Sequence, residues 1–188
     1  MSNQLLTNEP SEEFAIRLSA VEAADSAQAL IDTVEALAEL KDERAIKPLI
    51  QVLGFNNPGA AVAAVEGLIQ IGVPAVAPLL EKLDGHNYGA RAWAIRALAG
   101  IGDLRGQDLL LEAAAEDFAM SVRRAAARGL GRLRWQDLPA EARLPSQLRS
   151  HRVLQQATRD EEWVVRYAAV VGLQDLAQAF RQHDPQPA

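Results

Sequence analysis

DGHNYGARAWAIRALAGIGD, which spans residues 84–103, contains the unit from which the fold can be inferred. It joins a turn with two glycines to a helix-forming segment that ends in a small residue, a leucine and, three places later, an apolar residue. This signature occurs five times, with its leucine at Leu37, Leu68, Leu98, Leu130 and Leu173. The leucines are 31, 30, 32 and 43 residues apart, so three periods are nearly equal and the last is longer. Such regular spacing indicates an internal repeat.

Each period predicts two helices joined by a turn, the second helix carrying the signature. The expected helices are residues 12–22, 26–40, 42–53, 60–71, 74–83, 88–101, 107–115, 121–133, 151–158 and 163–178. A helix pair of about thirty residues cannot bury its apolar stripe alone, so neighbouring pairs must stack. The sequence therefore predicts an all-α protein: one curved α-solenoid, or superhelix, of about five helical hairpins, with the second helices lining one face.

The predicted solenoid occupies residues 11–181 as a single domain. Pro139 and Pro145 break the period, which predicts an insertion at about residues 135–147. Residues 1–10 and 182–188 are expected to be flexible tails.

Composition narrows the class of protein. Apolar residues make up 49% of the chain and aromatic residues only 5%, which favours closely packed helices rich in Ala and Leu. A net charge of −6 argues against general affinity for nucleic acid or anionic membrane. The lack of cysteine excludes disulfides and Cys-based catalysis, and three scattered histidines predict no metal site. With no signal peptide and no apolar run long enough for insertion into a membrane, we expect a cytoplasmic protein.

Arginines recur at one position of the repeat. Arg91, Arg123 and Arg166 each precede a signature leucine by seven residues, or about two helical turns, and so lie over the same stripe as that leucine. One interpretation is structural, in which they pair with acids or carbonyls of the next hairpin. The other is that they bind a ligand.

Residues 121–134 contain five arginines and no acid. Arg124, Arg128 and Arg132 are four residues apart, so they form one ridge of the helix. Such a ridge can be merely solvated, can hold a carboxylated ligand through forked hydrogen bonds, or can dock an acidic partner.

Aromatic residues stand out in an array that otherwise packs with Ala and Leu. Tyr88 and Trp93 belong to one second helix, and Trp163 and Tyr167 to another. Large amphipathic rings near helix starts are candidate stacking surfaces, although core filling is an equal alternative. No catalytic triad, phosphate loop or metal set is present. Asp84 and His86, in the turn before Tyr88, could act as a general acid or base, or could simply be exposed.

Four segments, residues 54–72, 87–103, 121–130 and 160–168, resemble the E/F-type phycobilin lyases of cyanobacteria, in particular the F (beta) type of subunit. The resemblance covers about residues 42–180 and implies HEAT-like hairpins. It further implies a heterodimer with an E-type (alpha) subunit that attaches phycocyanobilin, as substrate rather than permanent cofactor, to a cysteine of the phycocyanin alpha subunit. Isomerising relatives carry a His-Cys pair in the turn where this chain has His86 and Asn87, so the resemblance implies attachment without isomerisation.

The resemblance turns the candidate residues into specific expectations. A bilin has flat rings and two propionates, so we expect bilin or its protein acceptor at Tyr88, Arg91, Trp93, Arg123, Arg124, Trp163, Arg166 and Tyr167. Arg128 and Arg132 are expected to bind the partner, and Asp84 or His86 to assist proton transfer. The alternative is a scaffold or chaperone without enzymatic activity, which docks on phycobiliproteins during assembly or degradation of the antenna.

Overall fold

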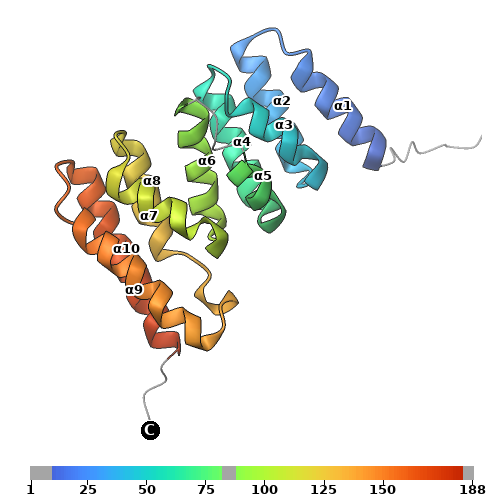
Figure 1. Cartoon of the computed structure of the whole chain (residues 1–188). Helices are drawn as coiled ribbons and strands as arrows, with labels where there is room; N and C mark the ends of the chain where they lie inside the picture. Colours follow the sequence, from blue (N-terminus) through green and yellow to red (C-terminus); the bar gives the residue numbers. More distant parts are fainter. Residues whose placement is uncertain (1–9, 82–87, 184–188) are drawn as a thin grey trace, which may run out of the picture.

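The computed structural model describes residues 10–81 and 88–183, and these residues form α-helices and short 3-10 turns with no strand. The helices pair into five stacked hairpins that make one curved array (Figure 1). The hairpins are α1 (Pro10–Glu22) with α2 (Ala27–Glu39), α3 (Ile46–Val52) with α4 (Pro58–Ile71), α5 (Val76–Glu81) with α6 (Tyr88–Ile101), α7 (Gln107–Glu116) with α8 (Met120–Gly131), and α9 (Ala140–Ala157) with α10 (Trp163–His183). The predicted all-α solenoid of five hairpins is confirmed.

Local chemistry sets where the helices begin and end. The Ser26 and Asn57 side chains accept the backbone N–H of Ala29 and Ala60, each at 3.1 Å, and so cap the starts of α2 and α4. Gly72 and Gly102 follow α4 and α6 with φ of 80° and 72°, a left-handed conformation that an L side chain would strain. The two glycines thus turn the chain from one hairpin into the next.

The second helices form a continuous layer, in which α2, α4, α6, α8 and α10 each pack against the next. They approach closely because small residues lie between them. A Cβ placed on Gly129 of α8 would lie 2.5 Å from the Cβ of Ala99 and 2.8 Å from its Cα on α6. A Cβ on Gly67 or Gly172 would likewise meet Ala38 or Ala127 of the neighbouring second helix, so contact between helices explains the glycine before these signature leucines.

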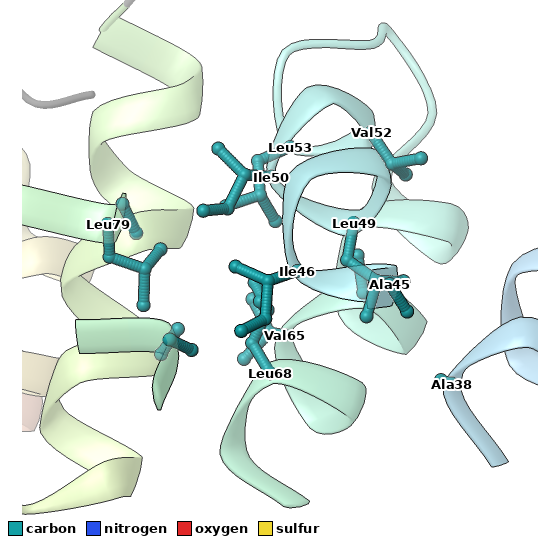
Figure 2. Close-up of a cluster of buried hydrophobic side chains, with 14 of the residues drawn as sticks. Ala38, Ala45, Ile46, Leu49, Ile50, Val52, Leu53, Val65, Leu68 and Leu79 are labelled. Carbon is teal, nitrogen blue, oxygen red and sulfur yellow. The ribbon is translucent and has the colours of Figure 1, made fainter. Parts of the chain in front are cut away.

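The signature leucines form the core of the array. Leu37, Leu68, Leu98 and Leu130 are at most 1% exposed, whereas Leu173 of α10 is only half-buried. Figure 2 shows one part of this core, where Ile46 and Ile50 of α3 point toward Leu79 of α5, and Val65 and Leu68 of α4 belong to the same cluster. Each hairpin thus buries its apolar stripe against its neighbours, as the repeat required.

The helix predicted at residues 151–158 begins earlier in the structure, within the predicted insertion at about residues 135–147. Trp135 is 1% exposed, and α9 begins at Ala140 and runs for 18 residues. The long fourth period thus arises mainly because the first helix of this hairpin is longer. Pro145 lies inside α9, in its second turn, where a proline removes one helical hydrogen bond. The C-terminal boundary also moves, because α10 extends through His183 rather than ending before residue 182.

No single helix among the described residues is long and apolar enough to cross a membrane. Residues 58–71 and 73–81 reach that composition only as a pair bent by 117°. The apolar face of α4 in this pair is buried within the solenoid core.

Candidate functional site

Two of the repeated arginines join consecutive hairpins. Arg91 of α6 pairs with Asp117 in the turn before α8, at 2.5 Å, and Arg123 of α8 pairs with Asp160 in the turn before α10, at 2.8 and 3.0 Å. Each aspartate also accepts a backbone N–H two residues later, which holds its carboxylate toward the arginine. For Arg91 and Arg123 the structural interpretation is therefore the observed one, and their guanidinium groups are already engaged.

The Arg123–Asp160 pair is the more buried of the two. The side chains are 10% and 11% exposed, and Arg123 also donates to the carbonyls of Asp117 and Phe118 at 2.9 and 3.1 Å. The hydrogen bond from Arg123 holds the pKa of the Asp160 carboxyl below its ordinary value, and the same contact raises the pKa of Arg123. This pair fixes the position of α10 against α8.

Arg166 occupies the same position in the last described hairpin but has a different environment. It is exposed, and its NH1 donates to the carbonyls of Asp160 and Glu161, both at 2.8 Å. No carboxylate among the described residues pairs with it. Geometry thus separates Arg166 from Arg91 and Arg123, although the sequence gives them equivalent places.

Arg124 and Arg128 of α8 lie on another face. Together with Trp163, Val164, Tyr167 and Ala168 of α10 they line a groove of about 520 Å³. Trp163 and Tyr167 are 66% and 65% exposed, so they do not fill the core. Among the described residues neither arginine has a carboxylate partner. The α8–α10 groove therefore combines free cations with exposed aromatic rings.

A second hollow of about 310 Å³ continues this groove toward α6. Its polar lining is Arg96, Arg124, Arg128 and Arg132, and its floor is small residues, among them Gly100 and Gly129. The predicted arginine ridge is thus confirmed as one surface. Arg96 also lies over the Trp93 ring, 4.8 Å from its centroid, while Arg132 pairs with Asp175 of α10 at 3.0 Å.

The remaining aromatic candidates are placed differently. Trp93 is partly buried and packs against the cluster of buried residues that the first three hairpins form. Tyr88 is 70% exposed and meets Phe118 edge to face, with ring centroids 5.8 Å apart, at the starts of α6 and α8. Asp84 and His86 lie outside the described residues. No group of three or more metal-ligating side chains occurs in the described part of the chain.

Sequence reasoning missed Arg96 and Phe118. The available signal for Arg96 was register, because Arg96 precedes Leu98 by two residues just as Arg128 precedes Leu130, so the third and fourth hairpins carry an arginine at the same position. Register also places Tyr88, Met120 and Trp163 ten residues before their leucines, and all three are exposed.

Another hollow, of about 580 Å³, lies where residues 155–160 meet Ala114 and Ala115. Arg159 is the one cation in its lining, which contains no aromatic side chain. The α8–α10 groove is therefore the better candidate for a large, flat, anionic ligand.

Comparison with known proteins gives a consistent result. Residues 14–99 and 76–146 match the model of HEAT repeats. The phycobilisome maturation protein of Synechococcus elongatus (strain PCC 7942) is 56% identical over 88% of this chain and 80% of its own length. The phycocyanin alpha phycocyanobilin lyase CpcF of Synechocystis sp. (strain PCC 6803) is 57% identical over 90% and 79%. The solved complex of CpcE and CpcF of phycocyanin lyase from Nostoc sp. PCC7120 contains a chain 50% identical to this one, with TM-score 0.68 over 73% of this chain and 81% of that chain.

Proposed function

This chain belongs to the phycocyanobilin lyase beta-subunit family of HEAT-repeat proteins, and on that premise we propose that it is one subunit of a heterodimeric bilin lyase. With an E-type subunit it attaches phycocyanobilin, through a thioether bond, to a cysteine of the phycocyanin alpha subunit. The relatives' names and the solved CpcE–CpcF complex support this assignment. The reaction serves assembly of the phycobilisome.

The observation that carries the proposal for a site is the composition of the α8–α10 groove. Arg124 and Arg128 pair with no carboxylate of the described chain and can bind the two propionates of the bilin, since arginine suits planar, bidentate binding of carboxylates. Trp163 and Tyr167 offer exposed rings against which the flat pyrroles can stack. At about 520 Å³ the groove falls within the range of small-molecule sites, roughly 300–1,000 Å³.

The main contribution of the protein to this reaction is to position the bilin for attack by the acceptor thiol. The acceptor thiol adds across a carbon–carbon double bond of the bilin side chain: one S–C bond forms, and the thiol hydrogen passes to the tetrapyrrole, so nothing is oxidised or released. This chain has no cysteine, so the nucleophile comes from the acceptor protein. Arg124, Arg128 and the two rings hold the bilin in one orientation for attack, a contribution that proximity effects can make large.

The groove also revises the assignment of the other candidates. Arg91 and Arg123 act on the site indirectly, because their ion pairs hold α6, α8 and α10 in register. Asp84 or His86 remains the proposed aid to proton transfer, and the lack of cysteine beside His86 remains the basis for attachment without isomerisation.

Coexpression with an E-type subunit, the apo-phycocyanin alpha subunit and a bilin source tests the proposal. We expect a covalent, red-absorbing product that requires both lyase chains. Arg124→Ala with Arg128→Ala, or Trp163→Ala with Tyr167→Ala, should lower the initial rate of product formation at least ~10-fold.

Arg152→Ala is the matched control, because Arg152 is an exposed arginine of α9 outside the groove lining. A rate unchanged by both double substitutions would refute the groove as the bilin site. Binding of phycocyanobilin without any covalent product would instead identify a scaffold.

A further inference from the structure

The ion pairs between consecutive hairpins form a regular series, here called a ladder with each pair as one rung, and the described chain does not complete the rung at α10. Each rung joins an arginine seven residues before a signature leucine to an aspartate thirteen residues before the next one, as in Arg91–Asp117 and Arg123–Asp160. Arg166 holds the arginine position of the fifth hairpin. Its rung has no carboxylate among the described residues.

Arg166 is arranged as the buried Arg123 is. In both residues NH1 donates to the two carbonyls of the turn before its own helix: Asp117 and Phe118 for Arg123, Asp160 and Glu161 for Arg166. In Arg123 the remaining Nε and NH2 groups then bind the next hairpin's aspartate. The Nε and NH2 groups of Arg166 have no such partner within the described chain, so they are available to a carboxylate from outside it.

The apolar residues beside Arg166 are also more exposed than their counterparts in the other hairpins. Val170 is 45% exposed, whereas its counterpart on α8, Ala127, is fully buried. Leu173 is half-buried, whereas the other four signature leucines are at most 1% exposed. In α8 these positions are covered by α10, and no described element covers them in α10.

This surface is distinct from the α8–α10 groove. At about 100° per residue, Arg166, Val170 and Leu173 share one stripe of α10, roughly two-fifths of the way round the helix from the groove-lining Val164, Tyr167 and Ala168. Arg166 therefore does not line the groove proposed for bilin, and its expected contact with bilin or the protein acceptor is not part of that proposal.

We propose that the α10 stripe formed by Arg166, Val170 and Leu173 docks a helical hairpin of the E-type subunit, which continues the solenoid as a sixth hairpin. The E-type hairpin supplies an aspartate or glutamate in the turn before its second helix, and this carboxylate pairs with Arg166. It also presents small residues to Val170, as α8 and α10 do to each other. The inference rests on the proposed heterodimer.

A second copy of this chain is a poorer occupant. The ladder needs an acid thirteen residues before a signature leucine, and in the first three hairpins those positions are Ala24, Phe55 and Gly85. The two acids that fit, Asp117 and Asp160, are already paired within the chain. The required carboxylate must therefore come from a different sequence.

Titration calorimetry of the full chain with its E-type subunit tests the inference. Arg166→Met and Val170→Asp should each raise the Kd at least ~10-fold, because each leaves a charge or polar group buried without a partner in the complex. Val62→Asp on α4 is the matched control, since Val62 is 38% exposed and lies away from α10. A photo-crosslinking residue at position 170, but not at 62, should capture the E-type subunit.

The outcomes separate the inference from the proposed function. If the unmodified chain binds and neither α10 variant weakens binding, only the inference is overturned. If position 170 crosslinks to a second copy of this chain, the occupant is wrong. Failure of the unmodified chain to bind an E-type subunit overturns both.

Discussion

Arg123→Met is the substitution whose effect on folding the structure predicts most directly. It removes the guanidinium from a pair whose side chains are 10% and 11% exposed, and leaves the Asp160 carboxylate and the Asp117 and Phe118 carbonyls without their donor. Removing one partner of a buried pair costs about 3–5 kcal/mol. Because Asp160 keeps the backbone N–H of Glu162, we expect the lower end, about 3 kcal/mol.

Arg166→Met is the matched control, because it makes the same chemical change at the same repeat position. Arg166 is exposed and its two carbonyl acceptors can turn to water, so the expected cost is under about 1 kcal/mol. Urea unfolding of the isolated chain, followed by circular dichroism, measures both. With m of about 2 kcal/mol/M, Arg123→Met should lower the midpoint by roughly 1.5 M. Equal shifts for the two variants would refute the distinction between a closed and an open rung.

Two further outcomes follow from packing and charge. Gly129→Ala should destabilise the chain by about 1–3 kcal/mol in urea unfolding, because its Cβ would lie 2.8 Å from the Ala99 backbone. Gly106→Ala is the control and should change stability by less than about 0.5 kcal/mol, because the nearest neighbour of its Cβ would be the Leu98 Cβ at 3.8 Å. A larger loss of stability for Gly106→Ala than for Gly129→Ala would contradict the packing argument. Arginine hydrogen bonds lower the pKa of Asp160 and Asp103 in the folded state, so their stabilisation is present above the ordinary aspartate pKa of 3.8 and is lost as the pH falls through the lowered values. Unfolding free energies measured from pH 6 down to pH 2 should therefore fall steeply below about pH 4, and less so for Asp160→Asn.

For the arginines, the repeat register predicts which face of a helix a side chain lies on but does not predict its partner. Spacing alone placed Arg124, Arg128 and Arg132 on one ridge, and the hollows along α8 confirm this. Spacing could not show that Arg132 pairs with Asp175, which is 43 residues away, whereas Arg124 and Arg128 have no carboxylate partner among the described residues. Whether a charged side chain is engaged depends on contacts between hairpins.

The structure of the long fourth period differs from the sequence-based prediction for a related reason. Two prolines that break the period predict an insertion at about residues 135–147, but Pro139 precedes the first residue of α9 and Pro145 lies in its second turn. Trp135 and one face of α9 are buried in the cluster that also contains Leu130 and Leu176, and this burial stabilises the helix despite the missing hydrogen bond. Propensity is a local quantity, and tertiary packing outweighed it here.

The sequence by itself determined the architecture, because a solenoid is stabilised by contacts between neighbouring units that recur at a fixed period. The five signature leucines and the small residues before them were sufficient for the class of fold, the number of hairpins and most helix bounds. Only the tertiary structure decided which of the equivalent arginines pair with a carboxylate of the described chain. Arg91, Arg123 and Arg166 share one sequence position, but a charged group is engaged or available according to what the next hairpin places opposite it. Beside Arg166 the described chain places no carboxylate.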